Sequence, residues 1–502
     1  MQPPAAAASR AAQKETLAGI SHDLQTSPAL GALLERLSSA AAAGDALGAP
    51  DAEAAAVRRA AVREALDAHR REARVPKELA QRMARLESTG YHAWVEARAA
   101  GDWSRFEPTL SAWVDALRAK ARAIDSEADA YTVLLQSYDK GNSRARLEEI
   151  FAELKQGLVP LLRDLRAARA AGKGPADPEW ILAPEGGAPY DEGAQAVLCR
   201  ELVLDLGFDL ARGRVDASVH PFTGGAGPTD VRLTTRFKPR DVTESLTGAI
   251  HEAGHGLYEQ GRPTGGEWEG LPVSEAAGMA AHESQSLLWE RMVGLSREYS
   301  AYLLPRLAKS FPDSAFAEAA AAGGDEAGGA ERLYGALNAL RVPSYVRVEA
   351  DEVHYPLHVL LRFEIEKALV DGSLAVSDVP AAWRAKALEY LGDAGYEGEA
   401  LGPLQDVHFS AGALGYFPTY TLGAAMAVQI FAAAKEQIPG LKEQIARGEF
   451  APLRSWLRER VHAKGSLYPS ADALLESATG RPLDVQIFLK YLSDKYRPLY
   501  GI

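Results

Sequence analysis

His251-Glu252-Ala253-Gly254-His255 is the stretch of sequence from which the organisation of this chain can be worked out. Two histidines four residues apart lie on the same face of a helix, so their imidazoles can bind a single cation. The carboxylate of Glu252 is then placed to accept a proton from a metal-bound water. We expect Zn²⁺, because neutral imidazole and carboxylate are its ordinary ligands.

The residues around this motif predict a helix from Asp241 to about Gln260. Asp241 is a suitable N-cap, and Glu244 completes the pattern of a capping box. Apolar residues recur at helical spacing through the segment. Three internal glycines lower its helix propensity, each by about 1 kcal/mol relative to alanine. We interpret them as room for a closely approaching group, such as a substrate backbone; they are Gly248, Gly254 and Gly256.

A catalytic zinc needs a third protein ligand and one open position. His282 and Glu283, on a helix predicted from Val273 to Val293, are the candidates. We prefer Glu283, because sites of this type commonly take a downstream glutamate, and His282 then supports a ligand from behind. A second histidine pair with the same spacing, His354 and His358, lacks the following glutamate, and we expect packing roles for it.

The composition limits the other functions. The chain has 502 residues, of which 47% are hydrophobic and 25% charged, as in a globular protein. Its net charge of −13 argues against nucleic acid and anionic membranes as partners. The single cysteine, Cys199, excludes an intrachain disulfide and is expected as a buried, inert thiol. Without a signal-peptide pattern or an uninterrupted apolar span, a cytoplasmic location is expected.

The apolar spacing predicts a mainly α-helical fold. Residues 1–15 are expected to form a flexible tail, and residues 16–502 a single body with helices through 16–170 and a catalytic region in 194–502. A further helix is predicted from about Glu349 to Leu369. Alternating patterns at 214–219 and 230–237, joined by a glycine-rich stretch, predict a small antiparallel β element beside the metal-binding helix.

Further segments point to a known family. HEAGHGLYEQG, from His251, is followed by HESQSLLWE, from His282; DVRLT begins at Asp230, VRVEAD at Val346, GPLQDVHF at Gly402 and GYFPTYTLG at Gly415. Together they resemble the carboxypeptidase Taq family of metallocarboxypeptidases. Two positions depart from the family's motifs: Val346 replaces isoleucine, and Phe409 replaces tryptophan, which removes an indole N–H donor.

The resemblance implies a groove-containing helical metallopeptidase whose N-terminal helices overhang the groove. His251, His255 and Glu283 would bind the metal, and Glu252 would be general base and then proton donor. The reaction would be hydrolysis of the C-terminal peptide bond of peptides with a free C-terminus, releasing single amino acids with broad specificity. The resemblance also implies Co²⁺ as a substitute for Zn²⁺, and a homodimer.

A carboxypeptidase must hold the terminal carboxylate of its substrate, for which a bidentate arginine is suited. Arg347 and Arg232 match the family's motifs, and we prefer Arg347. His408 and Tyr420 resemble groups that donate hydrogen bonds to the substrate or to the developing oxyanion in similar enzymes, with Tyr416 as the alternative tyrosine.

Two other functions fit parts of the pattern. An oligopeptidase with the same metal chemistry would cleave internal bonds and tolerate an amidated C-terminus. A non-catalytic helical protein with a structural metal would hold it with four protein ligands, whereas the sequence offers three, and Glu252 would then have no purpose.

Overall fold

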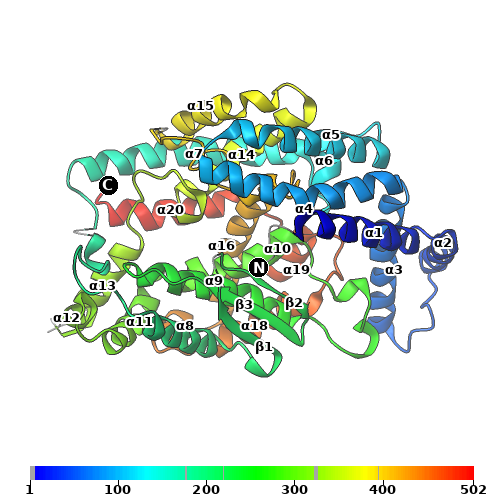
Figure 1. The fold of residues 1–502 in the computed structure, drawn as a ribbon. Coiled ribbons are helices and arrows are strands. Elements are labelled where there is room, and N and C mark those ends of the chain that lie inside the picture. The colour runs from blue at the N-terminus through cyan, green and yellow to red at the C-terminus, as the bar shows by residue number, and fades with distance from the viewer. Residues whose placement is uncertain (1–5, 176–177, 219, 322–325, 394) are drawn as a thin grey trace. The chain divides into compact units, whose positions relative to one another are not determined.

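The computed structural model describes residues 6–175, 178–218, 220–321, 326–393 and 395–502. Helices dominate this part of the chain, as the sequence predicts (Figure 1). The chain divides into two compact units, each built from separate stretches. The first comprises Met1–Val159, Gly270–Val273 and Arg341–Thr421, and the second Pro160–Glu269, Ser274–Leu340 and Leu422–Ile502. The regions 16–170 and 194–502 expected from the sequence therefore do not coincide with these units.

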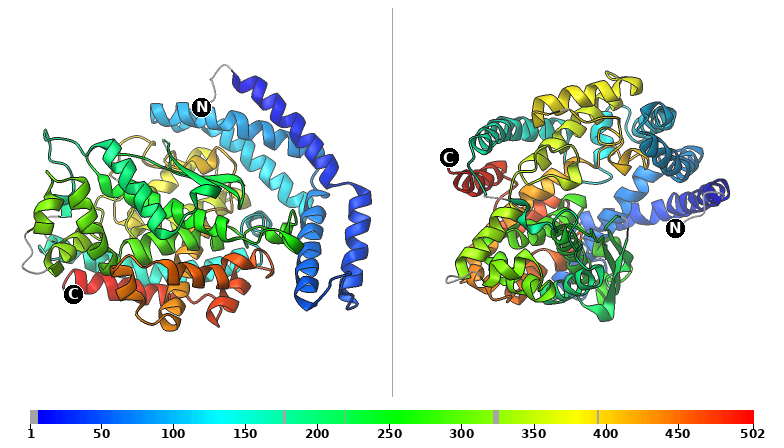
Figure 2. Two further views of the ribbon diagram at one scale, coloured as in Figure 1. Left: turned by 90° about the horizontal axis from the view of Figure 1, so that it is seen from below. Right: turned by 60° about the vertical axis from the view of Figure 1, so that its left-hand side comes forward.

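The first unit is helical. Its N-terminal helices pack as antiparallel pairs, with α1 along α4 and α2 along α3 (Figure 2). Helix α1 begins at Ala7, whereas the sequence predicts a flexible tail to residue 15. The helices are α1 (Ala7–Gln25), α2 (Pro28–Ala42), α3 (Ala52–Glu72), α4 (Lys77–Ala100), α5 (Glu107–Ile124), α6 (Ala130–Leu135), the first part of α7 (Arg144–Ala170), α14 (His354–Asp371) and α15 (Val379–Leu391).

Helix α14 lies in the core of the first unit. It begins at His354, five residues later than the sequence predicts, and Asp351 accepts hydrogen bonds from the backbone N–H groups at its start. Within it Arg362 and Glu366 form a fully buried ion pair at 2.9 Å. The Arg362 guanidinium carbon lies 3.2 Å from the centroid of the Phe409 ring, so the residue that departs from the family's motif packs against a buried cation.

The second unit combines helices with a small sheet. Helix α16 is buried from Leu422 to Ile430 and forms part of the core of this unit. The elements are the rest of α7, α8 (Glu192–Leu206), β1 (Gly213–Ala217), β2 (Thr223–Gly227), β3 (Asp230–Thr235), α9 (Val242–Gly261), α10 (Met279–Leu287), the π-helical turn η7 (Leu288–Gly294), α11 (Arg297–Ser310), α12 (Ala315–Ala321), α13 (Glu326–Leu337), most of α16 (Pro418–Gln437), α17 (Leu441–Ala446), α18 (Ala451–Arg460), α19 (Ala471–Thr479) and α20 (Val485–Leu499).

The sheet has the order β1-β3-β2 and packs against α9, and its β2–β3 pair is antiparallel as predicted. The predicted hairpin partners are wrong, because β1 pairs with β3 in parallel and the glycine-rich connection itself forms β2. A strand of sequence Thr-Gly-Gly-Ala-Gly has no side-chain alternation to reveal it. A Cβ at Gly225 would lie 1.8 Å from the Asp230 carbonyl oxygen, so only glycine allows this pairing.

The segment predicted as one helix from Val273 to Val293 is also different. The α-helix α10 begins at Met279, and from Leu288 the backbone continues as the π-helical turn η7. A π-helical turn rotates the side chains that follow relative to an α-helix, and such turns are frequent at functional sites.

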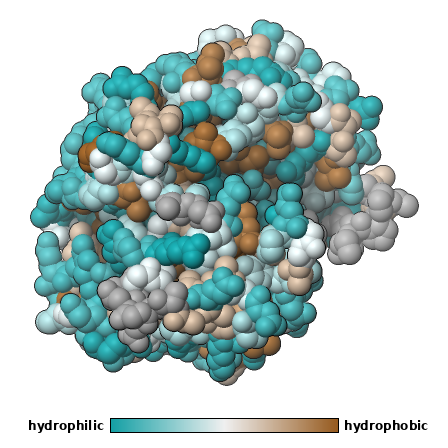
Figure 3. Space-filling view, turned by 90° about the vertical axis from the view of Figure 1, so that its left-hand side faces the viewer, coloured by the Kyte–Doolittle hydropathy of each residue, from teal (hydrophilic) through white to brown (hydrophobic). Residues whose placement is uncertain are grey.

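Within the described ranges, no helix has the length and apolar content needed to cross a membrane. The face shown in Figure 3 is largely hydrophilic, and hydrophobic side chains gather on it only in small groups.

Candidate active site

The site is built on helix α9, whose first backbone N–H groups are satisfied by the side chain of the N-cap residue, Asp241. The Asp241 carboxylate accepts hydrogen bonds from the backbone N–H groups of Thr243 and Glu244, at 3.0 and 3.3 Å. This confirms Asp241 as the predicted N-cap. Two turns further on, the helix presents His251 and His255 on one face, with ring centroids 5.0 Å apart.

His251, His255 and Glu283 come together in the second unit as the predicted metal ligands. The Oε2 atom of Glu283 lies 3.3 Å from His255 Nε2 and 3.8 Å from His251 Nε2, and the three ligand atoms lie within 4.8 Å of one another. Ligands about 2.0–2.1 Å from a tetrahedral zinc lie roughly 3.3 Å apart. Two imidazole nitrogens and one carboxylate at this spacing fit a divalent metal with an open coordination position.

Glu283 reaches this position because α9 and α10 approach closely at Gly254. A Cβ at Gly254 would lie 2.6 Å from both the Gln285 carbonyl oxygen and the Ser286 Cα. The interpretation of the α9 glycines as room for a closely approaching group is therefore confirmed at Gly254, where the group is the α10 backbone and not a substrate backbone. The same holds for Gly256, where a Cβ would meet the Phe208 ring at 2.8 Å.

A glutamate supports the first histidine from behind. The Nδ1 atom of His251 lies 2.6 Å from Glu290 Oε2, and the π-helical turn η7 carries Glu290. Such a bond fixes the ring orientation and leaves Nε2 for the metal. Burial alone would lower the pKa of His251, but Glu283 and Glu290 raise it to about 9. The negative surroundings that favour a proton here also favour a divalent cation.

The second histidine is supported by a longer chain of hydrogen bonds. His255 Nδ1 lies 2.6 Å from His282 Nδ1, and His282 Nε2 lies 2.8 Å from Glu259 Oε1. With Nε2 of His255 bound to a metal, its Nδ1–H donates to His282, which donates in turn to Glu259. Burial lowers the pKa of His282 and keeps this ring neutral, as the relay requires. Arg262, 3.2 Å from Glu259, balances the carboxylate.

The third candidate ligand is charged, as a metal ligand must be. Glu283 is buried, with 6% of its surface exposed. Burial would raise its pKa, but the neighbouring His251 and His255 hold that pKa well below its ordinary value. The carboxylate is therefore ionised throughout the neutral range.

The predicted general base, Glu252, lies in the same unit beside these ligands and is also buried. The Thr223 hydroxyl on β2 lies 2.7 Å from Glu252 Oε2 and 2.9 Å from the Glu252 carbonyl oxygen, and it donates to them. One carboxylate oxygen is thereby held by the protein, and the other remains to accept a proton.

Four of the other predicted residues come together in the first unit. Arg347 is buried, and its Nε and Nη2 atoms donate to Asp406 Oδ1 at 3.2 and 3.0 Å. It does not form the i,i+4 pair with Asp351 that its sequence position allows. Burial would lower the pKa of Arg347, but Asp406 raises it above its ordinary value. The guanidinium carbon lies 4.4 Å from the Tyr420 ring centroid.

The aromatic residues of this cluster contact one another. His408 Nε2 lies 2.9 Å from the Tyr420 hydroxyl oxygen. The His408 ring also packs against Tyr416 and Phe417, with centroids 5.4 and 4.9 Å away. Both predicted tyrosines therefore lie beside His408, and Tyr420 makes the hydrogen bond.

Arg232 lies in the second unit, as the candidate metal ligands do, but apart from them. It is exposed on β3 and pairs with Asp230 through two nitrogens, at 2.9 and 2.8 Å. Alternate residues of a strand face opposite sides of the sheet. Since Leu233 is fully buried and sits opposite Thr223, which contacts Glu252, Arg232 points to the other face. This supports the preference for Arg347.

Sequence reasoning missed Thr223, Glu290 and Asp406. Glu290 had a signal, because it follows Glu283 by seven residues and so shares its helical face. Asp406 belongs to the GPLQDVHF motif, but the motif does not reveal its partner Arg347, and no local pattern marks Thr223. The histidine pair His354 and His358 takes packing roles: His354 Nδ1 bonds Asp351 at 2.7 Å, and burial lowers the pKa of His358 to about 3.

Comparison with known proteins agrees with this geometry. The thermostable carboxypeptidase 1 of Thermus thermophilus is 38% identical over 501 residues, which cover 98% of this chain and 92% of that protein. Carboxypeptidase 1 of Bacillus subtilis is 34% identical over 81% of this chain and 77% of its own length. The crystal structure of the M32 carboxypeptidase from Deinococcus radiodurans R1 superposes with a TM-score of 0.86 at 34% identity, covering 100% of this chain and 94% of the other. Residues 1–496 match the family model of the carboxypeptidase Taq (M32) metallopeptidases, and the chain therefore belongs to this family of metal-dependent carboxypeptidases.

Proposed function

We propose that this enzyme hydrolyses the C-terminal peptide bond of peptides with a free C-terminus and releases single amino acids with broad side-chain specificity. The observation that carries the proposal is the cluster of His251, His255 and Glu283 beside the buried carboxylate of Glu252. Three protein ligands leave a coordination position open, which a structural site does not.

When bound, a divalent metal polarises the scissile carbonyl and acidifies the attacking water. Glu252 then takes the proton of that water on the oxygen that Thr223 leaves free, and passes it to the leaving amine. Thr223 holds the carboxylate in one orientation through both steps. Glu290 and His282 keep the two ligand imidazoles in place, so the charge that develops in the transition state meets a preorganised site.

Arg347 is proposed to hold the terminal carboxylate of the substrate. Asp406 keeps the guanidinium charged and fixes its plane through Nε and Nη2, which leaves Nη1 for a second anion. His408 and Tyr420 are proposed to donate hydrogen bonds to the substrate or to the oxyanion, and their mutual bond orients both side chains.

Three further properties are proposals. Zn²⁺ is the proposed metal, with Co²⁺ as a substitute, because the ligand set is imidazole and carboxylate. A homodimer follows from the family resemblance, and a cytoplasmic location from the single, buried cysteine.

Mass spectrometry of one ordinary peptide, as free acid and as C-terminal amide, tests the proposal. We expect a ladder that shortens by one residue at a time from the free acid alone and disappears with chelator. Glu252→Gln should retain zinc and lose activity by roughly 10²- to 10⁴-fold. Glu244→Gln, the same substitution two turns earlier on α9, is the matched control and should remain active.

Other outcomes assign the alternatives. Internal fragments from both peptide forms would establish an oligopeptidase. Stoichiometric zinc without cleavage of either peptide would show that the metal is structural.

A further inference from the structure

Helix α16 contains a glycine in its second turn, Gly423, although most of the residues that follow are alanine and larger apolar residues. A glycine inside a helix is less favourable than alanine, so its presence calls for a local reason. Gly423 is the last residue of the GYFPTYTLG segment that begins at Gly415. It lies in the second unit, as the candidate metal ligands do.

The reason is the close approach of the candidate ligand Glu283. A Cβ at Gly423 would lie 2.7 Å from the Cβ and 2.9 Å from the Cγ of Glu283, and 3.1 Å from the Ala280 carbonyl oxygen. The Cβ of Glu283 is fixed by the α10 backbone and cannot swing away. Glycine at position 423 therefore lets α16 pack directly against the stem of the Glu283 side chain.

Helix α10 is also tightly packed against its neighbours. Its backbone lies so close to α9 that a Cβ at Gly254 would be 2.6 Å from the Ser286 Cα. Residues of α10 and α16 line an interior space that is too small to hold a water molecule, so these two helices have little freedom to move. These residues are Ala281 and Ser284 of α10, and Met426 and Ile430 of α16.

A hydroxyl group holds the other end of the Glu283 side chain. The Ser286 hydroxyl, one turn later on α10, donates to Glu283 Oε2 at 3.2 Å and to the Glu283 carbonyl oxygen at 2.8 Å. Oε2 is also the oxygen that lies 3.3 Å from His255 Nε2. Ser286 is fully buried, so water does not compete for its hydrogen bonds. The hydroxyl therefore favours the carboxylate orientation that faces the histidines.

We propose that Gly423 and Ser286 are positioning residues for Glu283. Gly423 fixes the direction of the side-chain stem, and Ser286 fixes the orientation of the carboxylate, so that Oε2 faces the two imidazoles. Metal–ligand distances tolerate only about 0.2 Å, so a ligand on a flexible side chain binds more tightly when its torsions are set beforehand. The inference rests on the proposed metal site, and it adds that α16, which supplies none of the three candidate ligands, shapes that site.

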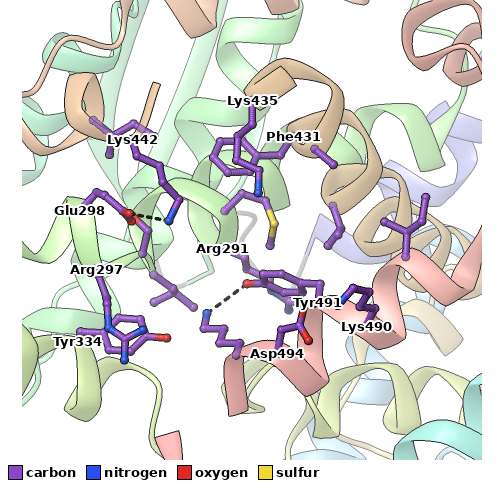
Figure 4. A pocket seen from close by; sticks show the side chains of 18 residues that line it. Arg291, Arg297, Glu298, Tyr334, Phe431, Lys435, Lys442, Lys490, Tyr491 and Asp494 are labelled. Atoms are coloured by element: carbon purple, nitrogen blue, oxygen red, sulfur yellow. Dashed lines mark hydrogen bonds and ion pairs between the residues drawn. The ribbon is translucent and has the colours of Figure 1, made fainter. Parts of the chain in front are cut away.

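The same helix offers a control position on a different surface. Further along α16, Phe431 and Lys435 line a pocket of about 370 Å³, together with side chains of η7 and α20 (Figure 4). Ala432 also lines this pocket, and none of the candidate metal ligands does. A small group added to Ala432 therefore faces the pocket, whereas one added to Gly423 meets Glu283.

Competition with a chromophoric chelator measures the zinc affinity of the wild type and its variants. Gly423→Ala should bind zinc roughly 10- to 100-fold more weakly, because the added methyl group turns the stem of Glu283. Ser286→Ala should bind zinc roughly tenfold more weakly, because the carboxylate loses its hydrogen bond although no atom is added. Ala432→Ser, which adds one heavy atom to the same helix at the pocket, should bind zinc as the wild type does.

The visible absorption of the cobalt-loaded protein separates positioning from a loss of stability. The Co²⁺ bands depend on the number and arrangement of the ligands, so they should change in Gly423→Ala and Ser286→Ala and not in Ala432→Ser. A loss of stability alone would lower the midpoint of unfolding and leave these bands unchanged. If zinc affinity and the cobalt bands are both unchanged in either variant, the role of that residue is overturned.

Glu283→Ala separates this proposal from the metal site on which it rests. Suppose that Glu283→Ala weakens zinc binding, whereas Gly423→Ala and Ser286→Ala do not. The positioning roles are then overturned and the metal site stands. Zinc binding that Glu283→Ala leaves unchanged overturns the assignment of Glu283 as a ligand, and with it the metal site of the proposed function.

Discussion

The close contact between α9 and α10 at Gly254 makes a quantitative prediction. A Cβ at this position would lie 2.6 Å from the Gln285 carbonyl oxygen and the Ser286 Cα, both backbone atoms that cannot rotate away. Ordinary contact begins at 3.4 Å, so Gly254→Ala must separate the two helices by about 0.8 Å. Glu283, on the displaced helix, would move away from His255 by a similar amount.

The displacement is several times the tolerance of a metal–ligand bond, which is about 0.2 Å. We expect the zinc affinity of Gly254→Ala to fall by roughly 10- to 100-fold. Overpacking costs about 1–3 kcal/mol of unfolding free energy, and alanine returns about 1 kcal/mol through helix propensity. The metal-free variant should therefore lose about 0–2 kcal/mol.

Gly248→Ala is the matched control on the same helix. A Cβ there would lie 3.5 Å from the Thr235 hydroxyl and 3.8 Å from Pro221, which is ordinary contact. This variant should keep its zinc affinity and gain up to about 1 kcal/mol of stability. Chelator competition and urea unfolding of the metal-free proteins measure both quantities. If Gly254→Ala binds zinc as tightly as Gly248→Ala, the inference that Gly254 positions Glu283 is refuted.

Three further predictions concern the side chains around the reaction centre. The pKa of His251 is raised from 6.5 to about 9. Its protonated form therefore stabilises the metal-free protein fully below pH 6.5, and this stability is lost as the pH rises through 9. Chelator competition should show a zinc affinity that increases up to about pH 9 in the wild type and levels off at a lower pH in Glu290→Gln. Arg347→Lys keeps the positive charge but loses the planar guanidinium that can bind a carboxylate through two nitrogens, and should raise KM for free-acid peptides by roughly tenfold or more. Arg232→Lys should change this KM by less than about twofold. Equal effects of the two substitutions would remove the reason for preferring Arg347. Thr223→Val deletes one hydroxyl at nearly constant volume and should lower kcat by about tenfold at unchanged zinc affinity, as steady-state kinetics and zinc titration will show.

The cluster of candidate metal ligands could be predicted because its pattern is local. His251 and His255 share a face through the helical period alone, and Glu283 follows on the next helix. The N-cap at Asp241 could be predicted for the same reason. Each of these assignments uses relations within one or two adjacent helices, where spacing in the sequence translates into spacing in three dimensions.

The remaining features depend on contacts between distant segments. Arg347 and Asp406 are 59 residues apart, and no periodicity connects them. Strand β2 contains three glycines, so its pairing rests on backbone atoms rather than on a side-chain pattern. The turn to a π-helix at Leu288 arises where Glu290 must face His251, a requirement set by another helix. Sequence reasoning therefore selected three candidate ligands that the structure brings together, and missed much of what holds them.

Charge balance explains why the residues around the candidate metal ligands have these charges. Three carboxylates lie around His251: Glu252, Glu283 and Glu290. The positive charge of Arg291, which lies near Glu283 and Glu290, offsets one of these three negative charges, so that two remain. Buried charges of one sign are costly unless they are matched. A divalent cation neutralises the group; without it, the protein can recover only one charge by protonating His251, which is why the pKa of this imidazole rises to about 9. The proton on His251 and the metal ion are therefore attracted by the same carboxylates, and metal binding must release that proton.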